Sequence, residues 1–486
     1  MTNTLPTTDR SRWLALVVLC AGMLMIVLDA TIVNVALPSI QRDLGFSQSA
    51  LAWVVNAYLI PFGGLLLLAG RLGDLVGRKR VSLAGLAVFT VASLLCGLSG
   101  SRELLVGARL LQGVGGAMTS TVILGVIVTM FPEAREQARA IGVFSFTAAA
   151  GGSVGLLAGG VLTQAVSWHW IFFVNLPIGV AAAVLAQRLI ARDPGIGLRR
   201  GADVPGALLV TSALMLGVYA IVQARDAGWT SAPTLGLGAA AVLLMAGFFV
   251  RQALAANPLL PLGLFRSRSV SGANVVQMLM VAGIFGMFFL GALYLQRVLG
   301  YDPLQIGLAF LPVAVAIGAL SFRLSAELNT RFGARTMLLV GLALILAGLL
   351  LFARAPLDAR YPVDILPAMV LLGIGGGLSF PAIMTLGMSG ATASDSGLVS
   401  GLVNTTAQVG GSLGLAALAT LATSRTDHLL ATGQGAAAAL TGGYHLAFGA
   451  GAALVAAALV VAAAVLPPGA PAEAESDDEG EDREAA

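Results

Sequence analysis

The sequence predicts an all-α polytopic membrane protein that crosses the bilayer fourteen times. Of its 486 residues, 57% are hydrophobic and only 10% are charged, and the mean hydropathy is +0.91. Such a composition excludes a soluble globular protein. The chain also contains fourteen apolar runs of about 20 residues or more, the length that a helix needs to cross the hydrocarbon core.

Short polar connections separate the apolar runs. We expect the spans at residues 13–36, 49–69, 81–100, 103–130, 138–165, 171–191, 205–224, 233–253, 270–297, 303–325, 335–354, 364–388, 396–424 and 443–466. The first run is longer than the core of a signal peptide and lacks a small-residue cleavage site, so we interpret it as a span. Residues 1–12 then form a cytoplasmic N-terminus, and the acidic residues 467–486 form a disordered cytoplasmic tail.

Basic residues predict the orientation. Most of the 27 Lys and Arg residues fall on one face of the predicted topology if the N-terminus lies inside the cell. Lys and Arg near the ends of spans stay on the cytoplasmic side, and an even number of spans places both termini on the same face. We therefore expect a multi-pass protein of the cell membrane with both termini in the cytoplasm.

A charged stretch at residues 70–81 separates two apolar runs and must turn at the membrane surface. Gly73 and Gly77 suit a tight turn between two helices. Asp74 is the single acid of the stretch and lies close to Arg78 and Lys79. An acid at a helix terminus beside basic groups can form a latch that one conformation makes and another breaks. The alternative is an ordinary cytoplasmic turn that follows the charge rule.

A faint internal repeat relates this stretch to residues 323–336, which join the tenth and eleventh spans. In the second copy, the positions of Gly73, Asp74, Gly77 and Lys79 are taken by Asn329, Thr330, Gly333 and Arg335. Such a repeat predicts two six-helix halves, 13–191 and 270–466, with a site between them. The segment 205–253 is then an inserted helix pair, and its lack of mid-span polar residues predicts a lipid-facing position.

Two charged side chains, Asp29 and Arg109, lie deep inside predicted spans. Asp29 is sixteen residues beyond Trp13, roughly 24 Å from the cytoplasmic side, and Arg109 lies about 9 Å below the opposite face. Both therefore fall in the outer half of a core about 30 Å thick, and they could share one cavity and form a pair. Intramembrane charges usually mark transport pathways, although a snorkelling or purely structural charge is the alternative.

Uncharged polar residues inside spans are the candidates for the wall of a substrate cavity. They are Asn34, Asn56, Gln112, Gln277, Tyr294, Gln296, Asn404 and Gln408. Each could equally form a hydrogen bond between helices without touching a substrate.

Several of these patterns resemble one known family, the major facilitator superfamily. The loop residues Gly70, Gly73, Asp74, Gly77, Arg78 and Lys79 match its signature between the second and third helices. Arg109, Gln112, Gly113 and Gly116 resemble its fourth-helix motif, whose Arg is associated with proton coupling. Residues 28–47, with Asp29, Thr31 and Asn34, resemble the first-helix signature of its fourteen-helix drug:proton antiporter branch, and residues 167–179 and 401–414 are similar to the same branch.

The fifth span departs from this resemblance at one position. The antiporter-type glycines Gly151, Gly155, Gly159 and Gly160 are present, but Leu156 stands where the family has proline. The glycine spacing still suits close helix packing. With leucine at this position, the helix lacks the fixed kink that proline imposes and keeps the backbone N–H that proline lacks.

The sequence contains no Walker motif, metal-ligand spacing or nucleophile elbow, so we expect neither an enzyme nor a cofactor, and no nucleic-acid partner. The resemblance implies a monomer that exports hydrophobic small molecules, such as an antibiotic or a toxic metabolite, by alternating access driven by the proton gradient. One alternative is a dedicated transporter of one metabolite, lipid precursor or siderophore, and another is a membrane sensor or scaffold. Because Asp29 is the one deep acid, neutral, zwitterionic or weakly anionic substrates fit better than dications.

Overall fold

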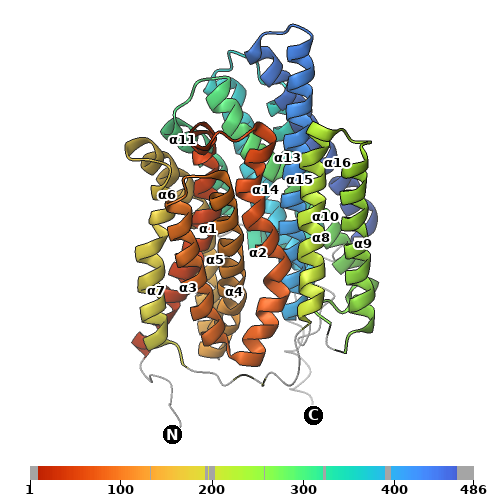
Figure 1. The fold of residues 1–486 in the computed structure, drawn as a ribbon. Coiled ribbons are helices and arrows are strands. Elements are labelled where there is room, and N and C mark those ends of the chain that lie inside the picture. The colour runs from red at the N-terminus through yellow and green to blue at the C-terminus, as the bar shows by residue number, and fades with distance from the viewer. Residues whose placement is uncertain are drawn as a thin grey trace, which may run out of the picture.

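The computed structural model describes residues 9–467 apart from 132, 192–194, 196, 198–202, 257, 321–324 and 389–395. The regular structure in this part of the chain is helical throughout, and the long helices run side by side in one bundle (Figure 1). Of the expected cytoplasmic N-terminus, residues 1–8 lie outside the described residues and residues 9–12 belong to the first helix. Of the expected acidic tail, residues 468–486 lie outside the described residues.

The N-terminal part of the chain forms one group of packed helices. These are α1 (Asp9–Leu44), α2 (Gln48–Val76), α3 (Arg78–Gly97), α4 (Arg102–Met130), α5 (Ala134–Ala165), α6 (Trp170–Phe173) and α7 (Asn175–Leu189). Helix α4 packs against α2 and α3, and α1 packs against α5 and α7. Helix α1 is therefore covered by neighbours along most of its length.

The C-terminal part forms a second group. Its helices are α10 (Arg268–Arg297), α11 (Pro303–Ala319), α12 (Ser325–Phe332), α13 (Ala334–Phe352), α14 (Leu366–Met388), α15 (Ser396–Ala431) and α16 (Ala436–Val465). A 3-10 turn, Leu262–Arg266, leads into α10, and a π-helical turn, Tyr361–Ile365, leads into α14. The two groups meet mainly where α2 packs on α15 and where α5 packs on α11.

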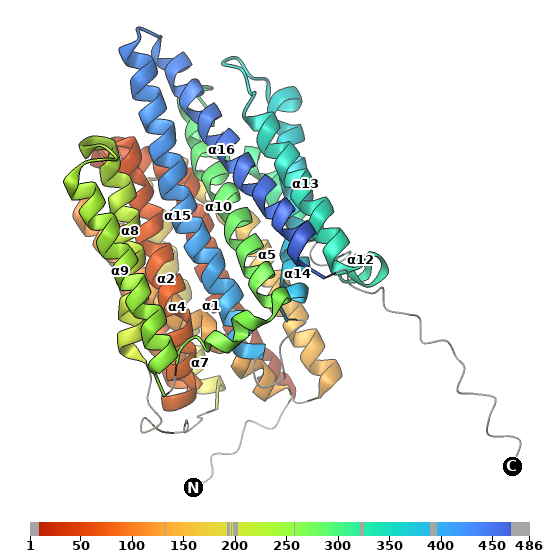
Figure 2. The same ribbon diagram turned by 90° about the vertical axis from the view of Figure 1, so that its right-hand side faces the viewer.

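The inserted pair forms a hairpin of α8 (Val204–Ala227) and α9 (Ala232–Leu254) at the edge of the bundle (Figure 2). Helix α8 packs on α2 and α15, one helix from each group. The outer face of α9 is apolar and exposed, with Val242 68% and Leu243 70% exposed. An exposed apolar helix face of this kind suits contact with lipid, as the sequence predicts.

The fourteen predicted spans correspond to α1–α5, α7–α11 and α13–α16. Within the described residues, 11 helices are long and apolar enough to cross a membrane, and Val154–Ala165 and Pro303–Ala319 are shorter apolar helices. The predicted ends are less accurate, since α1 continues to Leu44 and α15 to Ala431. Hydropathy finds only the part of a helix that lies in hydrocarbon, so polar helical ends are missed.

The two copies of the internal repeat share one backbone geometry. Gly77, between α2 and α3, has a φ of 107°, and Gly333, between α12 and α13, has a φ of 81°. Each donates its N–H at 3.0 Å to the carbonyl four residues earlier, Gly73 and Asn329 respectively. Only glycine adopts such positive φ angles without strain. This agreement supports the repeat that the sequence predicts.

Candidate functional site

The deep acid and the deep base form an ion pair between α1 and α4. Arg109 Nη1 donates to Asp29 Oδ2 at 2.5 Å, and both side chains are fully buried. The structure thus confirms the pairing that the sequence analysis suggested. It does not leave the pair at the wall of an open cavity, because neither side chain is accessible. A charge pair this deep needs further hydrogen bonds to offset its desolvation.

Two amides supply those bonds. Gln112 Nε2 and Asn175 Nδ2 each donate to Asp29 Oδ1 at 2.9 Å, one from α4 and the other from the first residue of α7. Gln112 also accepts from Arg109 Nη1 at 2.8 Å and donates to Ser93 Oγ of α3 at 2.8 Å. The carboxylate therefore accepts three charge-assisted bonds, which are the strongest class of protein hydrogen bond.

The guanidinium of Arg109 also links α4 to α2. Its Nε donates to the carbonyl oxygen of Val54 at 2.9 Å, and its central carbon lies 4.5 Å from the centroid of the Tyr58 ring. The ring of Phe172 lies 5.8 Å away. A planar cation between aromatic faces is stabilised by cation–π attraction. The buried cluster therefore connects α1, α2, α3, α4 and α7.

Glycines of α4 explain how one arginine reaches so many neighbours. A Cβ at Gly113 would lie 2.4 Å from the carbonyl oxygen of Tyr58, and one at Gly115 would lie 2.5 Å from the backbone nitrogen of Phe89. A Cβ at Gly116 would meet the ring of Phe62 at 3.0 Å. Because these positions have no side chain, α2 and α3 approach the backbone of α4 directly. Arg109 then lies within hydrogen-bond range of both α1 and α2.

The basic residues of the loop at 70–81 tie α3 to its neighbours. Lys79 is buried, and its Nζ donates to the carbonyl oxygens of Gln187 at 2.7 Å and Ile190 at 2.5 Å. Arg78 Nη1 donates to the carbonyl oxygen of Gly125 in α4 at 2.8 Å. Cations suit the C-terminal end of a helix, where carbonyl groups lack intrahelical partners. These contacts fasten the start of α3 to α4 and to the end of α7.

Asp74, the acid of the predicted latch, lies at the surface. Its carboxylate is exposed and pairs with Arg78 one turn away, at 3.2 Å. Gly73 beside it packs closely on α4, since a Cβ there would lie 2.6 Å from Val122. Residues 389–395, which precede α15, lie outside the described residues. The latch therefore stays a prediction, and the structure shows Asp74 only in a local ion pair.

The glycines of α5 press this helix against α1. A Cβ at Gly155 would lie 2.1 Å from Thr31 Oγ1, one at Gly159 would lie 2.8 Å from the carbonyl oxygen of Ile32, and one at Gly151 would lie 3.1 Å from Val27. Backbones this close cannot be separated by a side chain without moving a helix. The packed segment of α1 contains Asp29.

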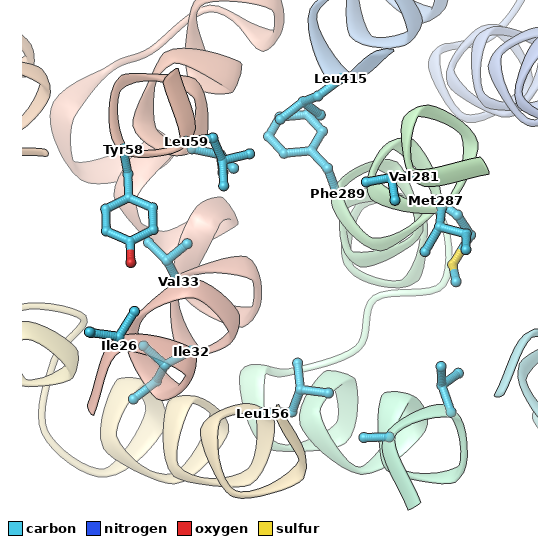
Figure 3. Packing of buried hydrophobic residues seen from close by; sticks show 14 of the residues in the cluster. Ile26, Ile32, Val33, Tyr58, Leu59, Leu156, Val281, Met287, Phe289 and Leu415 are labelled. Atoms are coloured by element: carbon cyan, nitrogen blue, oxygen red, sulfur yellow. The ribbon is translucent and has the colours of Figure 1, made fainter. Parts of the chain in front are cut away.

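The same helix touches the C-terminal group on its other face. A Cβ at Gly160 would lie 2.8 Å from the carbonyl oxygen of Pro303, and one at Gly307 of α11 would lie 2.6 Å from that of Leu156. Leu156 is buried where the two groups of helices meet (Figure 3). Helix α5 runs unbroken past this position from Ala134 to Ala165. The leucine thus occurs in a continuous helix that connects α1 with the C-terminal group.

Comparison with known proteins identifies the family. A family model described as Major Facilitator Superfamily matches residues 19–415. The chain belongs to the Major Facilitator Superfamily. The puromycin resistance protein pur8 of Streptomyces alboniger is 38% identical to this transporter over 457 residues, which are 92% of this chain and 90% of pur8. The cephamycin export protein CmcT of Amycolatopsis lactamdurans is 38% identical over 417 residues, 85% of each chain.

One more similar sequence and two solved structures point to the same kind of protein. The tetracenomycin C resistance and export protein of Streptomyces glaucescens is 36% identical over 416 residues, 85% of this chain and 76% of its own. Among solved structures, a bacterial homolog of the human lysosomal transporter Spinster aligns with a TM-score of 0.65 at 15% identity, over 94% of this chain and 97% of that one. The POT family transporter PepTSo aligns at 0.67 and 15%, over 94% and 99%. These relatives confirm the predicted fold and the resemblance to the drug-exporting branch.

Three of the cavity candidates in this transporter are amides with buried hydrogen-bonding atoms that have no partner among the described residues, and the residues Asn56 and Gln277 are themselves buried. Among the described residues, neither amide atom of Asn56 has a partner, and the Oε1 atoms of Gln277 and Gln408 also lack one. Gln408 of α15 lies against α2, since a Cβ at Gly63 would be 2.5 Å from its Cβ. Buried polar groups are normally paired, so unpaired ones need an explanation.

The remaining candidates are already bonded or lie elsewhere. Asn34 Nδ2 donates to Ala30 of its own helix at 3.2 Å, and Tyr294 donates to the carbonyl oxygen of Pro356 at 2.6 Å. Gln112 belongs to the ion-pair cluster, and Asn404 is exposed. The structure therefore does not bring all of the predicted cavity residues to one place.

A pocket of about 450 Å³ opens at the ends of α1 and α10 and the start of α11. Its lining residues are Pro38, Gln41, Arg42, Gln296, Arg297, Gly300, Tyr301, Asp302 and Pro303. Arg297 donates to Gln41 across the boundary between the two groups of helices. The sequence analysis treated Gln296 as a candidate for the cavity wall but did not expect this pocket.

The sequence analysis also missed Asn175, Ser93 and Tyr58 as parts of the buried cluster. None of these three side chains carries a charge, so they do not stand out as charges in an apolar run. Asn175 lies inside the predicted span 171–191 and is an amide in an apolar run. That signal was present, and it would have been found by applying the rule for buried polar groups to every span.

Proposed function

We propose that this transporter exports hydrophobic small molecules, such as antibiotics or toxic metabolites, in exchange for protons. The observation that carries the proposal is the fully buried ion pair of Asp29 and Arg109. The relatives named as puromycin resistance, cephamycin export and tetracenomycin C resistance and export proteins support the direction and the chemical class of the substrate.

Asp29 is the proposed proton carrier. Arg109 stays charged at any accessible pH, so only the carboxyl of the pair can take up and release a proton. With Asp29 ionised, its bonds to Arg109, Gln112 and Asn175 are charge-assisted and hold α1 against α4 and α7. Protonation of the carboxyl weakens these bonds. Those from Gln112 and Asn175 lose their charge assistance, and Arg109 loses its ion-pair attraction to the carboxylate. The proton state of Asp29 thus changes how firmly α1 is held.

Helix α1 can pass this change to the other group of helices. It packs on α5, whose opposite face lies on α11, and it also contacts α10 directly. At its far end Gln41 accepts from Arg297 of α10. We propose that the two groups rock about these contacts, so that substrate and proton face the two sides of the membrane alternately.

The unpartnered amides Asn56, Gln277 and Gln408 are the proposed polar contacts for the substrate. Amides offer donors and acceptors without a net charge. They therefore favour neutral or zwitterionic molecules over dications, which need a second carboxylate. We further propose a monomer in the cell membrane with both termini in the cytoplasm, as the distribution of basic residues predicts.

Transport into inverted proteoliposomes tests the proposal. The purified chain is reconstituted, a pH gradient is imposed, and the accumulation of puromycin and of a neutral fluorescent dye is measured with and without a protonophore. Gradient-dependent accumulation that the protonophore abolishes is the expected result. Substrate accumulation that does not depend on the pH gradient would contradict exchange with protons. Absence of transport, together with no gain of resistance across an antibiotic panel in a pump-deficient host, would contradict export itself.

A further inference from the structure

Asn175 contacts the proposed proton carrier from a helix that the family resemblance does not assign to proton coupling. It is the first residue of α7, which follows the short helix α6 after Val174. Its side chain is fully buried, and Nδ2 donates to Asp29 Oδ1 at 2.9 Å and to Ser93 Oγ at 3.4 Å. Asn175 and Asp29 are 146 residues apart in the sequence.

The amide of Asn175 uses only its donor side in this arrangement. Its Oδ1 is buried and has no hydrogen-bond partner among the described residues. A buried amide oxygen without a partner is uncommon and costs free energy. The oxygen belongs to the same side chain that already bonds the carboxylate, so it lies next to Asp29.

A protonated Asp29 needs an acceptor, because its carboxyl then carries an O–H group. Most neighbouring groups cannot accept a hydrogen bond from this O–H. Arg109 has donors only. Gln112 Oε1 already accepts from Arg109 and from the Cys96 thiol, which uses both of its lone pairs. Ser93 Oγ accepts from Gln112 at 2.8 Å and donates to the carbonyl oxygen of Phe89 at 2.8 Å. Two buried oxygens near the pair, Asn175 Oδ1 and the Tyr58 hydroxyl, have no hydrogen-bond partner among the described residues. Of these two residues, Asn175 is the one whose side chain already bonds the carboxylate.

Two other titratable groups lie near the carboxyl. Cys96 of α3 donates its thiol to Gln112 Oε1 at 3.4 Å. Tyr58 of α2 is buried and its hydroxyl has no partner among the described residues, but it makes no described hydrogen bond to Asp29, whereas Asn175 does. Figure 3 shows this hydroxyl directed toward α1, beside Val33. With Arg109, these are the charged and titratable groups that the described helices place around Asp29.

We propose that Asn175 is a positioning residue that holds Asp29 in both of its protonation states. Nδ2 donates to the ionised carboxylate, and after rotation of the amide Oδ1 accepts the O–H of the protonated acid. The proposal rests on the proton exchange proposed above. An amide suits this role because it can donate and accept, whereas a leucine can do neither and an aspartate can only accept when ionised.

The test compares Asn175→Leu, Asn175→Ser and a matched control, Asn274→Leu. Asn274 is a buried amide of α10 whose two sides are both bonded, to the carbonyl oxygen of Val270 and to Thr406, at 2.8 and 2.7 Å. Its substitution removes a buried amide of the same size far from Asp29 in sequence. The serine variant keeps one group that can both donate and accept.

The first readout is the pH profile of transport at a fixed pH difference across proteoliposomes. Asn175→Leu should move the half-maximal pH upward by about one unit, because the lost bond to the charged form is stronger than the lost bond to the neutral form. Asn175→Ser should restore part of the shift, and Asn274→Leu should leave the profile unchanged. A wild-type profile for Asn175→Leu would overturn the proposal.

The second readout does not need transport. The infrared carbonyl band of protonated Asp29, assigned by its loss in Asp29→Asn, should move to higher frequency in Asn175→Leu because the O–H has lost its acceptor. An unmoved band would overturn the role of Asn175. A third outcome separates the two proposals. If the wild-type protein shows no proton-driven transport and the band is nevertheless shifted in Asn175→Leu, the proposed function is refuted and the role of Asn175 is not.

Discussion

Arg109 and Asp29 form a 2.5 Å ion pair that is closed off on every side, with neither side chain accessible. Breaking a buried pair by removing one partner leaves an uncompensated charge, which typically costs about 3–5 kcal/mol. The pair therefore contributes to the packing of α1 on α4 in addition to its proposed role in transport. Variants of either residue need a stability measurement beside the transport assay.

Replacing Asp29 by asparagine should abolish proton-driven accumulation and leave substrate binding measurable. The amide keeps the size of the side chain but cannot carry a proton on and off. Gradient-driven transport in proteoliposomes and equilibrium binding in detergent are the two measurements. Asp43→Asn is the control, because Asp43 lies at the end of the same helix and its bond from Trp168 Nε1 survives in an amide. Full gradient-driven transport by Asp29→Asn would rule out Asp29 as the carrier.

Arg109→Lys should lower the transport rate at least about tenfold although the charge is retained, because an ammonium cannot reproduce the planar fork of a guanidinium. Arg109 contacts Asp29, Gln112 and the carbonyl oxygen of Val54 at once. Arg102→Lys on the same helix is the matched control, since Arg102 is exposed and bonds only the carbonyl oxygen of Leu44 among the contacts described. Equal rates for the two variants would contradict a specific role for the guanidinium.

Asp74→Asn should reduce transport without lowering the amount of folded protein in the membrane. The ion pair of Asp74 with Arg78 is exposed, and exposed pairs contribute only about 0–1 kcal/mol. A loss of transport would then reflect a contact that another conformation makes, as a latch requires. Initial efflux rate and membrane level are measured together. Wild-type efflux would reduce the stretch at 70–81 to a topology signal.

Gly155→Leu should eliminate transport, because a Cβ there already meets Thr31 Oγ1 at 2.1 Å and the backbone of Leu28 at 3.0 Å. The added side chain would push α5 away from the segment of α1 that contains Asp29. Gly107→Leu provides the control, since a Cβ at Gly107 meets nothing within 4 Å. Resistance and surface expression of both variants are compared. Equal resistance would show that close packing of α5 on α1 is dispensable.

The inserted hairpin should lose stability in acid. Burial raises the pKa of Asp203, but bonds from Arg251, Gln252 and the N–H of Gly206 outweigh it and hold the pKa below its ordinary value. The stabilisation is therefore fully present above about pH 4, the ordinary value, and is lost as pH falls through the lower folded pKa. Asp203→Asn should lower the thermal unfolding temperature in detergent near neutral pH, and the difference from wild type should shrink in acid. A difference that is independent of pH would contradict this assignment.

Hydropathy indicated the fourteen spans of this protein, and its repeat and motifs, such as those at 28–47 and 70–81, indicated the fold. Immersion in lipid imposes the same demand on every span, so a run of about 20 apolar residues is visible in one dimension. Asp29 and Arg109 were also visible, because a charge in an apolar run is rare. Gly77 and Gly333 could be matched since each copy of the repeat needs a positive φ at the same turn.

Only the tertiary structure decided which uncharged polar side chains join the ion pair. Asn175 and Ser93 contact the cluster, whereas Asn404, an equally polar residue of a predicted span, is exposed. An amide in an apolar run has the same local sequence pattern whether it faces a neighbouring helix or the outside of the bundle. Its partner is set by how α7 packs on α1 and α3 and how α3 packs on α4. Glycine contacts such as Gly179 with Thr90 and Gly115 with Phe89 join residues far apart in the chain, and that packing has no one-dimensional signature.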